Sequence, residues 1–329
     1  MRRRAFTLTA AFAMMLLPTV ALAQQDIVDK INYYGTLDHW TVREIRESGI
    51  IGGATKHLYE FYGSQTDTIR YDSKKSKAFR APAGYYWRTN NVYANVAGIE
   101  KVNITDFPEK RGNGYCIRIE THLEELKVAG MLNMDVVCQG VFLLGGLVEP
   151  IKDTKAPMAK TRYGIPFEGR PKALRFDYKA KVGCEVVKAT GFCKPKKMGY
   201  KDYPEFGLLL QKRWEDEDGR IHALRVGTAV ERITEDRNEW QNAYTMSVHY
   251  GDITEKPFYK DYMGLLNGTE QDLYAVNSKG KTVRVIEEGW AEADEEPNYL
   301  IIRFLSSCEK AFHGGLGNTL WIDNIKLVM

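Results

Sequence analysis

The sequence has few of the residues from which metal centres and nucleophilic active sites are built. Its 329 residues include six histidines and five cysteines, and these form neither a Cys-x-x-Cys pair nor a His-Glu-x-x-His segment. A Gly-x-Ser-x-Gly elbow is also missing, and glycine pairs such as Gly52-Gly53 lack the spacing of a phosphate-binding loop. These absences argue against a transition-metal centre, a nucleophile elbow and a phosphate loop.

An excess of charge of one sign is missing as well. The chain carries 46 Lys and Arg residues against 43 Asp and Glu residues, and three of the basic residues are Arg2, Arg3 and Arg4. Without them the chain is close to neutral, and its two signs are interleaved along the sequence. Nucleic acids and anionic membrane surfaces are bound by concentrated basic stripes. We therefore expect neither of them as a partner.

Long apolar runs are absent after the first 23 residues. The start of the chain places Arg2–Arg4 before an apolar stretch, Ala5–Val20, that closes on Ala21-Leu22-Ala23. This order is typical of a cleavable signal peptide over residues 1–23, and the stretch is too short and too broken for a comfortable membrane span. We expect a mature chain that begins at Gln24 and is exported to the periplasm or the cell exterior. The residue directly after the cleavage site is Gln24 and not a cysteine, so a lipoprotein is not expected.

The cysteine count is low and odd, and the residues are Cys116, Cys138, Cys184, Cys193 and Cys308. An odd number cannot pair completely within one chain. Cys184 and Cys193 are near enough in sequence to staple a hairpin, and free thiols are the alternative.

What the sequence does contain is a strong alternation of apolar and polar residues. Leu174, Phe176 and Tyr178 alternate with charged residues, and the same period of two runs through Tyr115–Ile119 and Tyr244–Tyr250. This period is typical of strands with one buried face and one solvated face.

Turn signals separate these strands, and no linker divides the chain. Asp218-Gly219 predicts a tight hairpin turn between two apolar strands. Only Asp26–Asn32 and parts of Thr41–Glu47 are expected to form short helices. The pattern predicts an all-β chain, an antiparallel jelly-roll β-sandwich, built as one domain over residues 24–329 with an extended N-terminal segment.

The last strand changes its buried face partway along. Leu320 and Ile322 are apolar at even positions, whereas Ile325 and Leu327 are apolar at odd ones. A shift of one residue in register is what a β-bulge produces. The pattern therefore predicts a bulge at Asp323-Asn324. The Asp323 carboxylate is expected to have a specific partner or to bond neighbouring backbone.

Short motifs recur in a fixed order along the chain. They are Leu37-Asp38-His39-Trp40, Trp87–Asn90, Gly114–Thr121, Arg170-Pro171 with Phe176–Lys179, and the ending Asn318–Leu327. Together they resemble the putative carbohydrate metabolism domain family. The resemblance implies a secreted, carbohydrate-binding-module-like jelly roll of the galactose-binding-like kind, tied to carbohydrate use. It supplies no catalytic residues.

The same resemblance implies a structural calcium ion. In such jelly rolls the first and last strands lie side by side, which would bring Asp38 and Asp323 near each other. Calcium is bound by six to eight oxygen ligands, and two carboxylates with backbone carbonyls could supply them. Asp38 and Asp323 are therefore the predicted metal ligands.

Sugar binding needs aromatic rings for the apolar face of a pyranose and polar groups for its hydroxyls. The residues of this kind that we predict as ligand-binding are Tyr85, Trp87, Arg88, Asn90, Trp214 and Trp240. In a strand, Tyr85 and Trp87 would share one face and Tyr86 would lie on the other. One of the two faces then belongs to the core, so a purely structural role for these residues stays open.

The sequence favours a noncatalytic carbohydrate-binding or glycan-utilisation accessory protein with an oligo- or polysaccharide as partner. A glycan-active enzyme is the first alternative, because two suitably spaced carboxylates suffice for glycoside hydrolysis and 43 acidic residues offer many pairs. A surface or assembly scaffold is the second alternative, with a protein partner that the sequence does not identify.

Overall fold

The computed structural model describes residues 24–61, 68–71, 79–128, 132–153, 155–191, 193–268 and 271–329. The predicted signal peptide lies outside these residues. Strands dominate the chain, and the all-β prediction is confirmed. Within the described ranges, no helix is long and apolar enough to cross a membrane.

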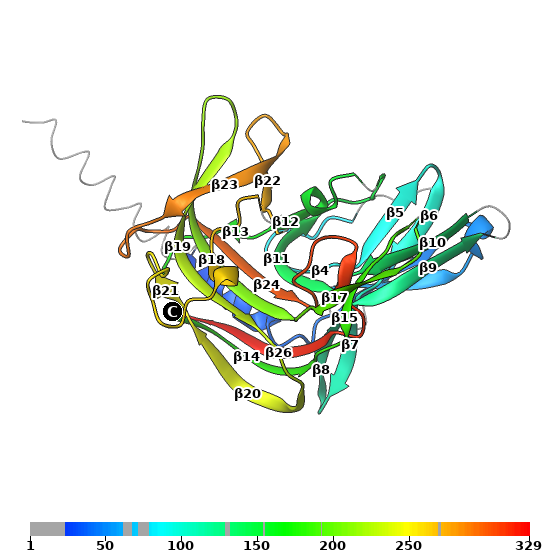
Figure 1. Ribbon diagram of the computed structural model, residues 1–329, viewed down its shortest axis with the longest axis horizontal. Helices are drawn as coiled ribbons and strands as arrows, with labels where there is room; N and C mark the ends of the chain where they lie inside the picture. The colour runs from blue at the N-terminus through cyan, green and yellow to red at the C-terminus, as the bar shows by residue number, and fades with distance from the viewer. Residues whose placement is uncertain are drawn as a thin grey trace, which may run out of the picture.

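The largest sheet has the strand order β12-β11-β24-β18-β19-β23-β22, with β4, β13 and β21 paired beside this path (Figure 1). Its strands are β4 (Trp87–Thr89), β11 (Val141–Leu147), β12 (Thr161–Tyr163), β13 (Ile165–Pro166), β18 (Glu205–Glu215), β19 (Ile221–Arg232), β21 (His249–Tyr250), β22 (Tyr274–Val276), β23 (Thr282–Trp290) and β24 (Tyr299–Leu305). The second sheet has the order β20-β14-β26-β8-β7. Its strands are β7 (Asp106–Arg111), β8 (Gly114–Glu120), β14 (Ala173–Lys181), β20 (Arg237–Ser247) and β26 (Thr319–Val328).

Four smaller sheets flank these two, in the orders β2-β1-β3, β16-β10-β9, β17-β15-β25 and β5-β6. Their strands are β1 (Thr41–Arg46), β2 (Thr55–Glu60), β3 (Thr68–Tyr71), β5 (Val92–Val96), β6 (Ile99–Asn103), β9 (His122–Val128), β10 (Leu132–Cys138), β15 (Glu185–Lys188), β16 (Thr190–Gly191), β17 (Lys196–Lys201) and β25 (His313–Gly315). The described residues also form three 3-10 helices: η1 (Gly49–Ile51), η2 (Pro157–Lys160) and η3 (Asp261–Met263).

The two larger sheets face each other and enclose the main core. Phe176 of β14 contacts Phe206 of β18 and Phe304 of β24, with ring centroids 4.8 and 5.1 Å apart. Leu320 and Ile322 of β26 are fully buried in the same cluster. Burial of one such side chain contributes about 1.5–3 kcal/mol relative to exposure. This contact area holds the second sheet below the first, as Figure 1 shows.

The largest sheet is buried on its other face as well. Leu209 of β18 and Ile301 of β24 belong to a second cluster, together with Leu266 and Leu273 from the segment that follows η3. Successive side chains of a strand point to opposite faces, so a strand covered on both sides must be apolar at consecutive positions. This explains the unbroken apolar run Leu208–Leu210.

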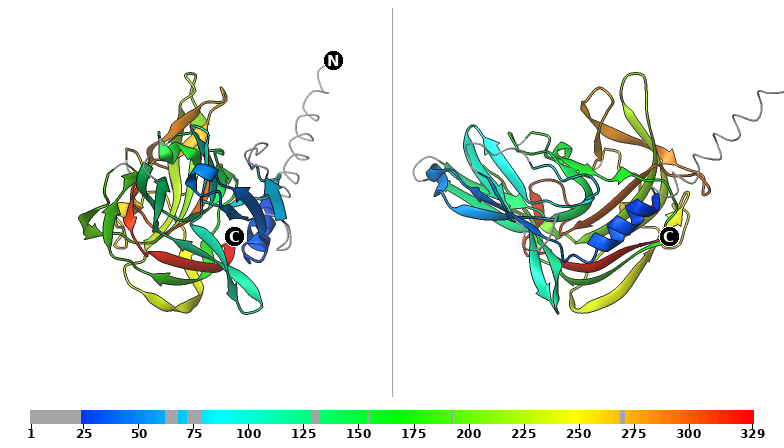
Figure 2. Two further views of the ribbon diagram at one scale, coloured as in Figure 1. Left: turned by 90° about the vertical axis from the view of Figure 1, so that its right-hand side faces the viewer. Right: turned by 180° about the vertical axis from the view of Figure 1, so that it is seen from behind.

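A helix at residues 24–34 confirms the helix predicted at Asp26–Asn32. Figure 2 shows it lying along the two larger sheets. Ile31 is fully buried in the main core. The Asn32 amide oxygen accepts a hydrogen bond from the backbone N–H of Leu327 in β26 at 2.7 Å. The start of the described chain is thus fixed to its last strand.

The helix predicted within Thr41–Glu47 is wrong, because these residues form strand β1. Thr41, Arg43 and Ile45 are buried, while the side chains between them are partly exposed. That is a period of two, and β-branched residues such as Ile45 favour strands. Pairing with β2 and β3 completes the backbone hydrogen bonds of this segment.

The bulge predicted in the last strand is confirmed. Asp323 lies opposite Asp177 and Lys326 lies opposite Arg175, so three steps on β26 match two on β14. Asn324 has a φ of 51°, a left-handed conformation that asparagine tolerates better than most residues. Leu320 and Leu327 are both buried despite their opposite parity.

Two further expectations differ from the structure. Cys184 and Cys193 are exposed free thiols. Of the two alternatives, free thiols are therefore found, and the disulfide across a hairpin is not. The jelly-roll order is not confirmed, because the largest sheet contains a parallel pair, β19 with β23, and β1 with β3 is parallel too.

Candidate functional site

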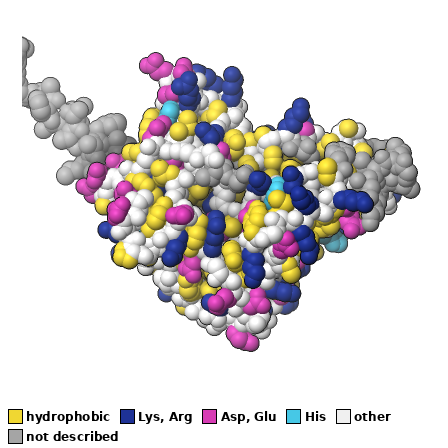
Figure 3. All heavy atoms as spheres, viewed as in Figure 1, with side chains coloured by type: hydrophobic (Ala, Val, Ile, Leu, Met, Phe, Trp, Pro, Cys, Tyr) yellow, Lys and Arg dark blue, Asp and Glu magenta, His cyan; other side chains and the backbone are white. Residues whose placement is uncertain are grey.

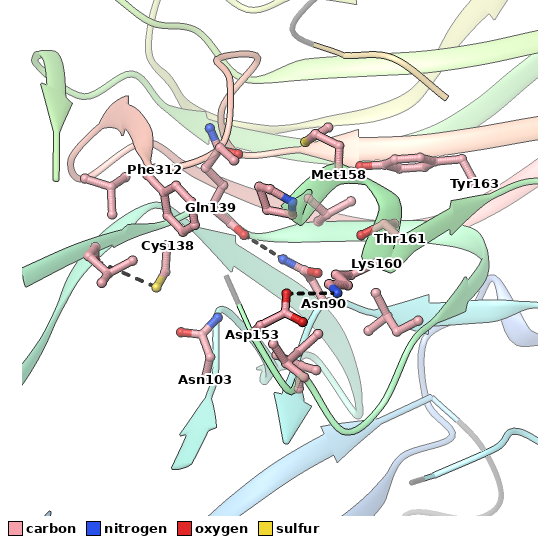
Figure 4. A pocket seen from close by; sticks show the side chains of 18 residues that line it. Asn90, Asn103, Cys138, Gln139, Asp153, Met158, Lys160, Thr161, Tyr163 and Phe312 are labelled. Carbon is pink, nitrogen blue, oxygen red and sulfur yellow. Dashed lines mark hydrogen bonds and ion pairs between the residues drawn. The ribbon is translucent and has the colours of Figure 1, made fainter. Parts of the chain in front are cut away.

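A pocket of about 230 Å³ opens where several sheets meet. Its walls come from β5, β6, β10, β11, β12 and η2, and from the loop that leads to β25. Figure 4 shows its polar and apolar side chains converging from these elements. The volume is several times the ~30 Å³ that one water molecule takes in the liquid. The pocket therefore has room for a small organic ligand or one end of a longer one.

Asn90 forms the floor of the pocket and is held rigidly. Its backbone N–H donates to Asp106 Oδ2 at 2.6 Å, and its side-chain Nδ2 donates to the carbonyl oxygen of Gln139 at 2.9 Å. Asp106 is fully buried, and this burial raises its pKa well above the ordinary value. Among the described contacts the Oδ1 of Asn90 has no donor, so it is available to a ligand.

Asn103 contributes an unused acceptor. It ends strand β6, directly opposite Val92 of β5, and it lines the pocket. Its side-chain Oδ1 is buried and has no hydrogen-bond partner in the part of the chain that the structure describes. A buried acceptor without a donor costs about 1–3 kcal/mol. A ligand hydroxyl that donated to it would remove this cost.

Charged groups stand at the mouth of the pocket. The Asp153 carboxylate lies 3.4 Å from the Lys160 ammonium at the end of η2, as the dashed line in Figure 4 marks. The backbone N–H of Lys155 and the side chain of Lys160 lower the pKa of Asp153, so this carboxyl is ionised at neutral pH. Thr161 and Tyr163 add hydroxyl-bearing side chains to the lining of the pocket.

The opposite wall is apolar and includes Phe312, Met158 and Val141. Phe312 has a φ of 65°, and such a conformation costs a residue with a side chain on the order of 1–3 kcal/mol. The loop that carries it is held by Gln139, whose Nε2 donates to the carbonyl oxygen of Lys310 at 3.1 Å and that of His313 at 2.6 Å. The ring is thus fixed against the pocket.

This arrangement suits a ligand that is polar at its rim and apolar on one face. Neutral amides supply both donors and acceptors, and the apolar wall excludes water from one side. Asp153 is the one carboxylate among the described residues that line the pocket. Glycoside hydrolysis by the usual routes uses two carboxylates.

The predicted ligand residues are spread over the molecule, and of these six only Asn90 lines the pocket. Trp87 is 1% exposed and stacks on Phe142 with ring centroids 4.9 Å apart, so no ligand reaches its ring. Arg88 is also buried, and its Nη2 lies 3.3 Å from Glu60. These two positions are core positions, because β4 is covered on both faces.

The other three predicted aromatic residues lie at separate surface positions. Tyr85 packs beside Tyr34 near the N-terminal helix, with ring centroids 5.0 Å apart. Trp214 is 43% exposed near the tip of the β18–β19 hairpin, where it stacks on His222. Trp240 lies on edge strand β20 under the guanidinium of Arg111, whose Cζ is 3.7 Å from the ring centroid.

Asp38 and Asp323, the predicted calcium ligands, both have partners within the protein. Asp38 Oδ1 accepts from the backbone N–H of Tyr115 at 2.9 Å. Asp323 Oδ2 lies 2.6 Å from Arg111 Nη1, and Asp323 Oδ1 accepts from its neighbour Asn324 at 2.7 Å. The cation beside Asp323 is a guanidinium. Over the described ranges, no group of three or more carboxylate, histidine or cysteine side chains could hold a metal ion.

Several pocket residues were not predicted from the sequence, among them Asn103, Gln139, Asp153 and Lys160. Asn103 ends a short strand, Asp153 lies in a loop, and Lys160 ends the four-residue 3-10 helix η2, too short to show a helical period in the sequence. Their proximity depends on how β6, β10 and η2 meet in space, which no spacing in the sequence reveals.

Two solved structures are similar to this chain. One is described as a putative glycoside hydrolase from Bacteroides thetaiotaomicron, with 17% identity over 84% of this chain and 81% of that chain and a TM-score of 0.43. The other is described as a putative glycoside hydrolase from Bacteroides vulgatus, with 15% identity over 87% of this chain and 94% of that chain and a TM-score of 0.45. Similarities this low carry no conclusion about the activity of this chain. No protein-family model and no curated protein matches the sequence.

Proposed function

We propose that the protein binds a carbohydrate in this pocket without cleaving it, as an exported accessory protein of glycan use. The supporting observation is the combination of the unused Asn103 acceptor with a fixed apolar wall and one lone carboxylate. A sugar presents hydroxyls around an apolar C–H surface. The hydroxyls can donate to Asn103, and the C–H surface can pack on the apolar wall of the pocket. The proposal also includes export through the predicted signal peptide. It further includes a single domain over residues 24–329 with a jelly-roll arrangement of the two facing sheets.

A glycan array probed with the mature protein tests the proposal. The best-bound oligosaccharide is then titrated calorimetrically against the wild type and Asn103→Ala. Loss of one neutral hydrogen bond is worth about 0.5–1.5 kcal/mol, so we expect affinity to fall about 3- to 10-fold. Removal of an amide oxygen that has no protein partner should leave the fold intact.

Asn238→Ala is the matched control, because Asn238 is an exposed residue of β20 outside the pocket. The control should bind like the wild type. No array signal, or equal affinity of Asn103→Ala and the wild type, would contradict binding in this pocket. Release of reducing sugar from any bound glycan would contradict the noncatalytic role and favour a glycan-active enzyme.

A further inference from the structure

A row of aromatic and cationic side chains crosses the outer face of the second sheet, one from each strand. In spatial order the row is Trp240, Lys179, Trp321, Arg118 and Phe107. Lys179 lies directly opposite Trp321, Trp321 opposite Arg118, and Arg118 opposite Phe107. The neighbours of Trp321 along β26, Leu320 and Ile322, are fully buried in the core. The row therefore lies on the face turned away from the core.

The contacts along the row alternate between rings and cations. Lys179 Nζ lies 4.8 Å from the ring centroid of Trp321 and 5.4 Å from that of Trp240. Arg118 Cζ lies 4.4 Å from the ring centroid of Phe107. Because adjacent strands are about 4.8 Å apart, an aromatic ring recurs at every second strand, about 9.5 Å from the last. A straight polymer lying across the strands would meet rings and cations in turn.

The four carboxylates beside the row share two guanidinium groups. Asp177 and Asp323 lie 2.8 and 2.6 Å from Arg111 Nη1. Glu109 and Glu120 both pair with Arg118. Lys179 differs from these arginines, because no described carboxylate lies within ion-pair distance of its ammonium.

Further positive charge on this face is also unpaired. Arg175 and Lys326 are exposed and lie directly opposite each other on β14 and β26. Like charges in this position repel and destabilise a sheet. In the described part of the chain neither has a carboxylate partner, and the same holds for the exposed Lys181 at the end of β14. Lys179, Arg175, Lys326 and Lys181 are therefore the cations of this face with which an external anion can pair.

We infer that this face binds an extended acidic polysaccharide, with sugar rings packed on Trp240 and Trp321 and with uronate carboxylates at Lys179 and at the Arg175–Lys326 pair. The site is separate from the pocket and does not depend on the pocket's function. Arg111 covers one face of the Trp240 indole and fixes its orientation. Single-stranded nucleic acid also stacks on aromatic rings, so it is the competing ligand in the test.

The test uses hexamers of galacturonic acid and of mannuronic acid, with the methyl-esterified galacturonate hexamer as the uncharged counterpart. Calorimetric titration of the mature protein should show binding of at least one free acid and at least tenfold weaker binding of the ester. Trp240→Ala and Lys179→Gln should each weaken binding of that acid at least tenfold. Thermal melting confirms that each variant is folded.

Two controls separate this site from the rest of the molecule. Trp214→Ala removes an exposed indole elsewhere, and Lys188→Gln removes an exposed lysine of β15. Both should bind the acid like the wild type. The inference is overturned if neither acid binds, if the ester binds as well as the acid, if Trp240→Ala or Lys179→Gln binds like the wild type, or if single-stranded DNA binds more tightly than both acids.

Discussion

At the scale of single residues, His122, which begins β9, has a strongly raised pKa. Burial alone would lower its pKa, but the carboxylates of Glu120 and Glu124, each 3.5 Å from one ring nitrogen, outweigh burial and raise the pKa to about 9. Because the folded-state pKa lies above that of the unfolded chain, the stabilisation is fully present below about pH 6.5. It is lost as the pH rises through about 9.

His122→Gln should therefore cost stability at pH 6 and very little at pH 10. After solvent screening of a partly exposed site, we expect a loss of about 1–2 kcal/mol in the free energy of unfolding at pH 6. Urea denaturation of the variant and the wild type at both pH values measures it. Equal losses at pH 6 and pH 10 would show that the two carboxylates do not hold the imidazolium.

At the same scale, the sequence identified residue types better than their positions. Asn90 was predicted as a ligand residue and does line the pocket. Trp87 was predicted for the same reason and lies in the core, because a buried and an exposed indole look alike in a strand pattern. Asn103 could not be predicted as a ligand residue. What marks it is a buried side-chain oxygen without a hydrogen-bond donor, and only the folded structure shows this.

At the scale of elements, the bulge of β26 shows what a sequence can reveal when one strand has a clear period. The change of buried parity between Ile322 and Ile325 predicted it, and the register with β14 confirms it. Strand β1 was misread, because its charged residues between apolar ones also fit one or two turns of helix. Pairing with β2 and the parallel β3 decides between the two, and such long-range pairing is invisible locally.

The bulge also carries a prediction for Asn324. With a φ of 51°, a β-branched side chain at this position is strained by roughly 1–2 kcal/mol. Asn324→Val should lower the free energy of unfolding by at least that amount, and it also loses the hydrogen bond from Asn324 Nδ2 to Asp177 at 2.9 Å.

Asn324→Gly separates the two effects in the same urea titration, because glycine accepts the left-handed conformation but also lacks the amide. It should be less destabilised than Asn324→Val. If valine is tolerated as well as glycine, the bulge is not needed in this conformation.

At the scale of the whole molecule, the two signs of charge are close to balanced and mixed over the surface. Figure 3 shows Lys and Arg side chains interspersed with Asp and Glu side chains over one face, in keeping with the interleaved sequence. The two largest sheets hold together through their aromatic core, and the ion pair of Arg111 with Asp177 and Asp323 joins strands within the second sheet. The sequence indicated strands and turns, whereas the order of the strands in the sheets depends on contacts between distant segments.

The role of Arg111 leads to a prediction about calcium. Since a guanidinium already neutralises Asp323, addition of millimolar calcium after chelation should leave the melting temperature unchanged within about 1 °C, because a ligand stabilises only a folded state that it binds. Differential scanning calorimetry of the mature chain with EDTA and with calcium measures this. A rise of several degrees with calcium, absent in Asp323→Asn, would restore the predicted metal site.

The placement of β26 has a consequence for the order of folding. This strand lies between β14 and β8 in the middle of its sheet, and it also receives the N-terminal helix through Asn32. Neither neighbour can complete its backbone pairing before the final residues of the chain are available, and closing such long loops is slow. The second sheet therefore cannot be completed until β26 has been synthesised, although its other strands come earlier in the chain.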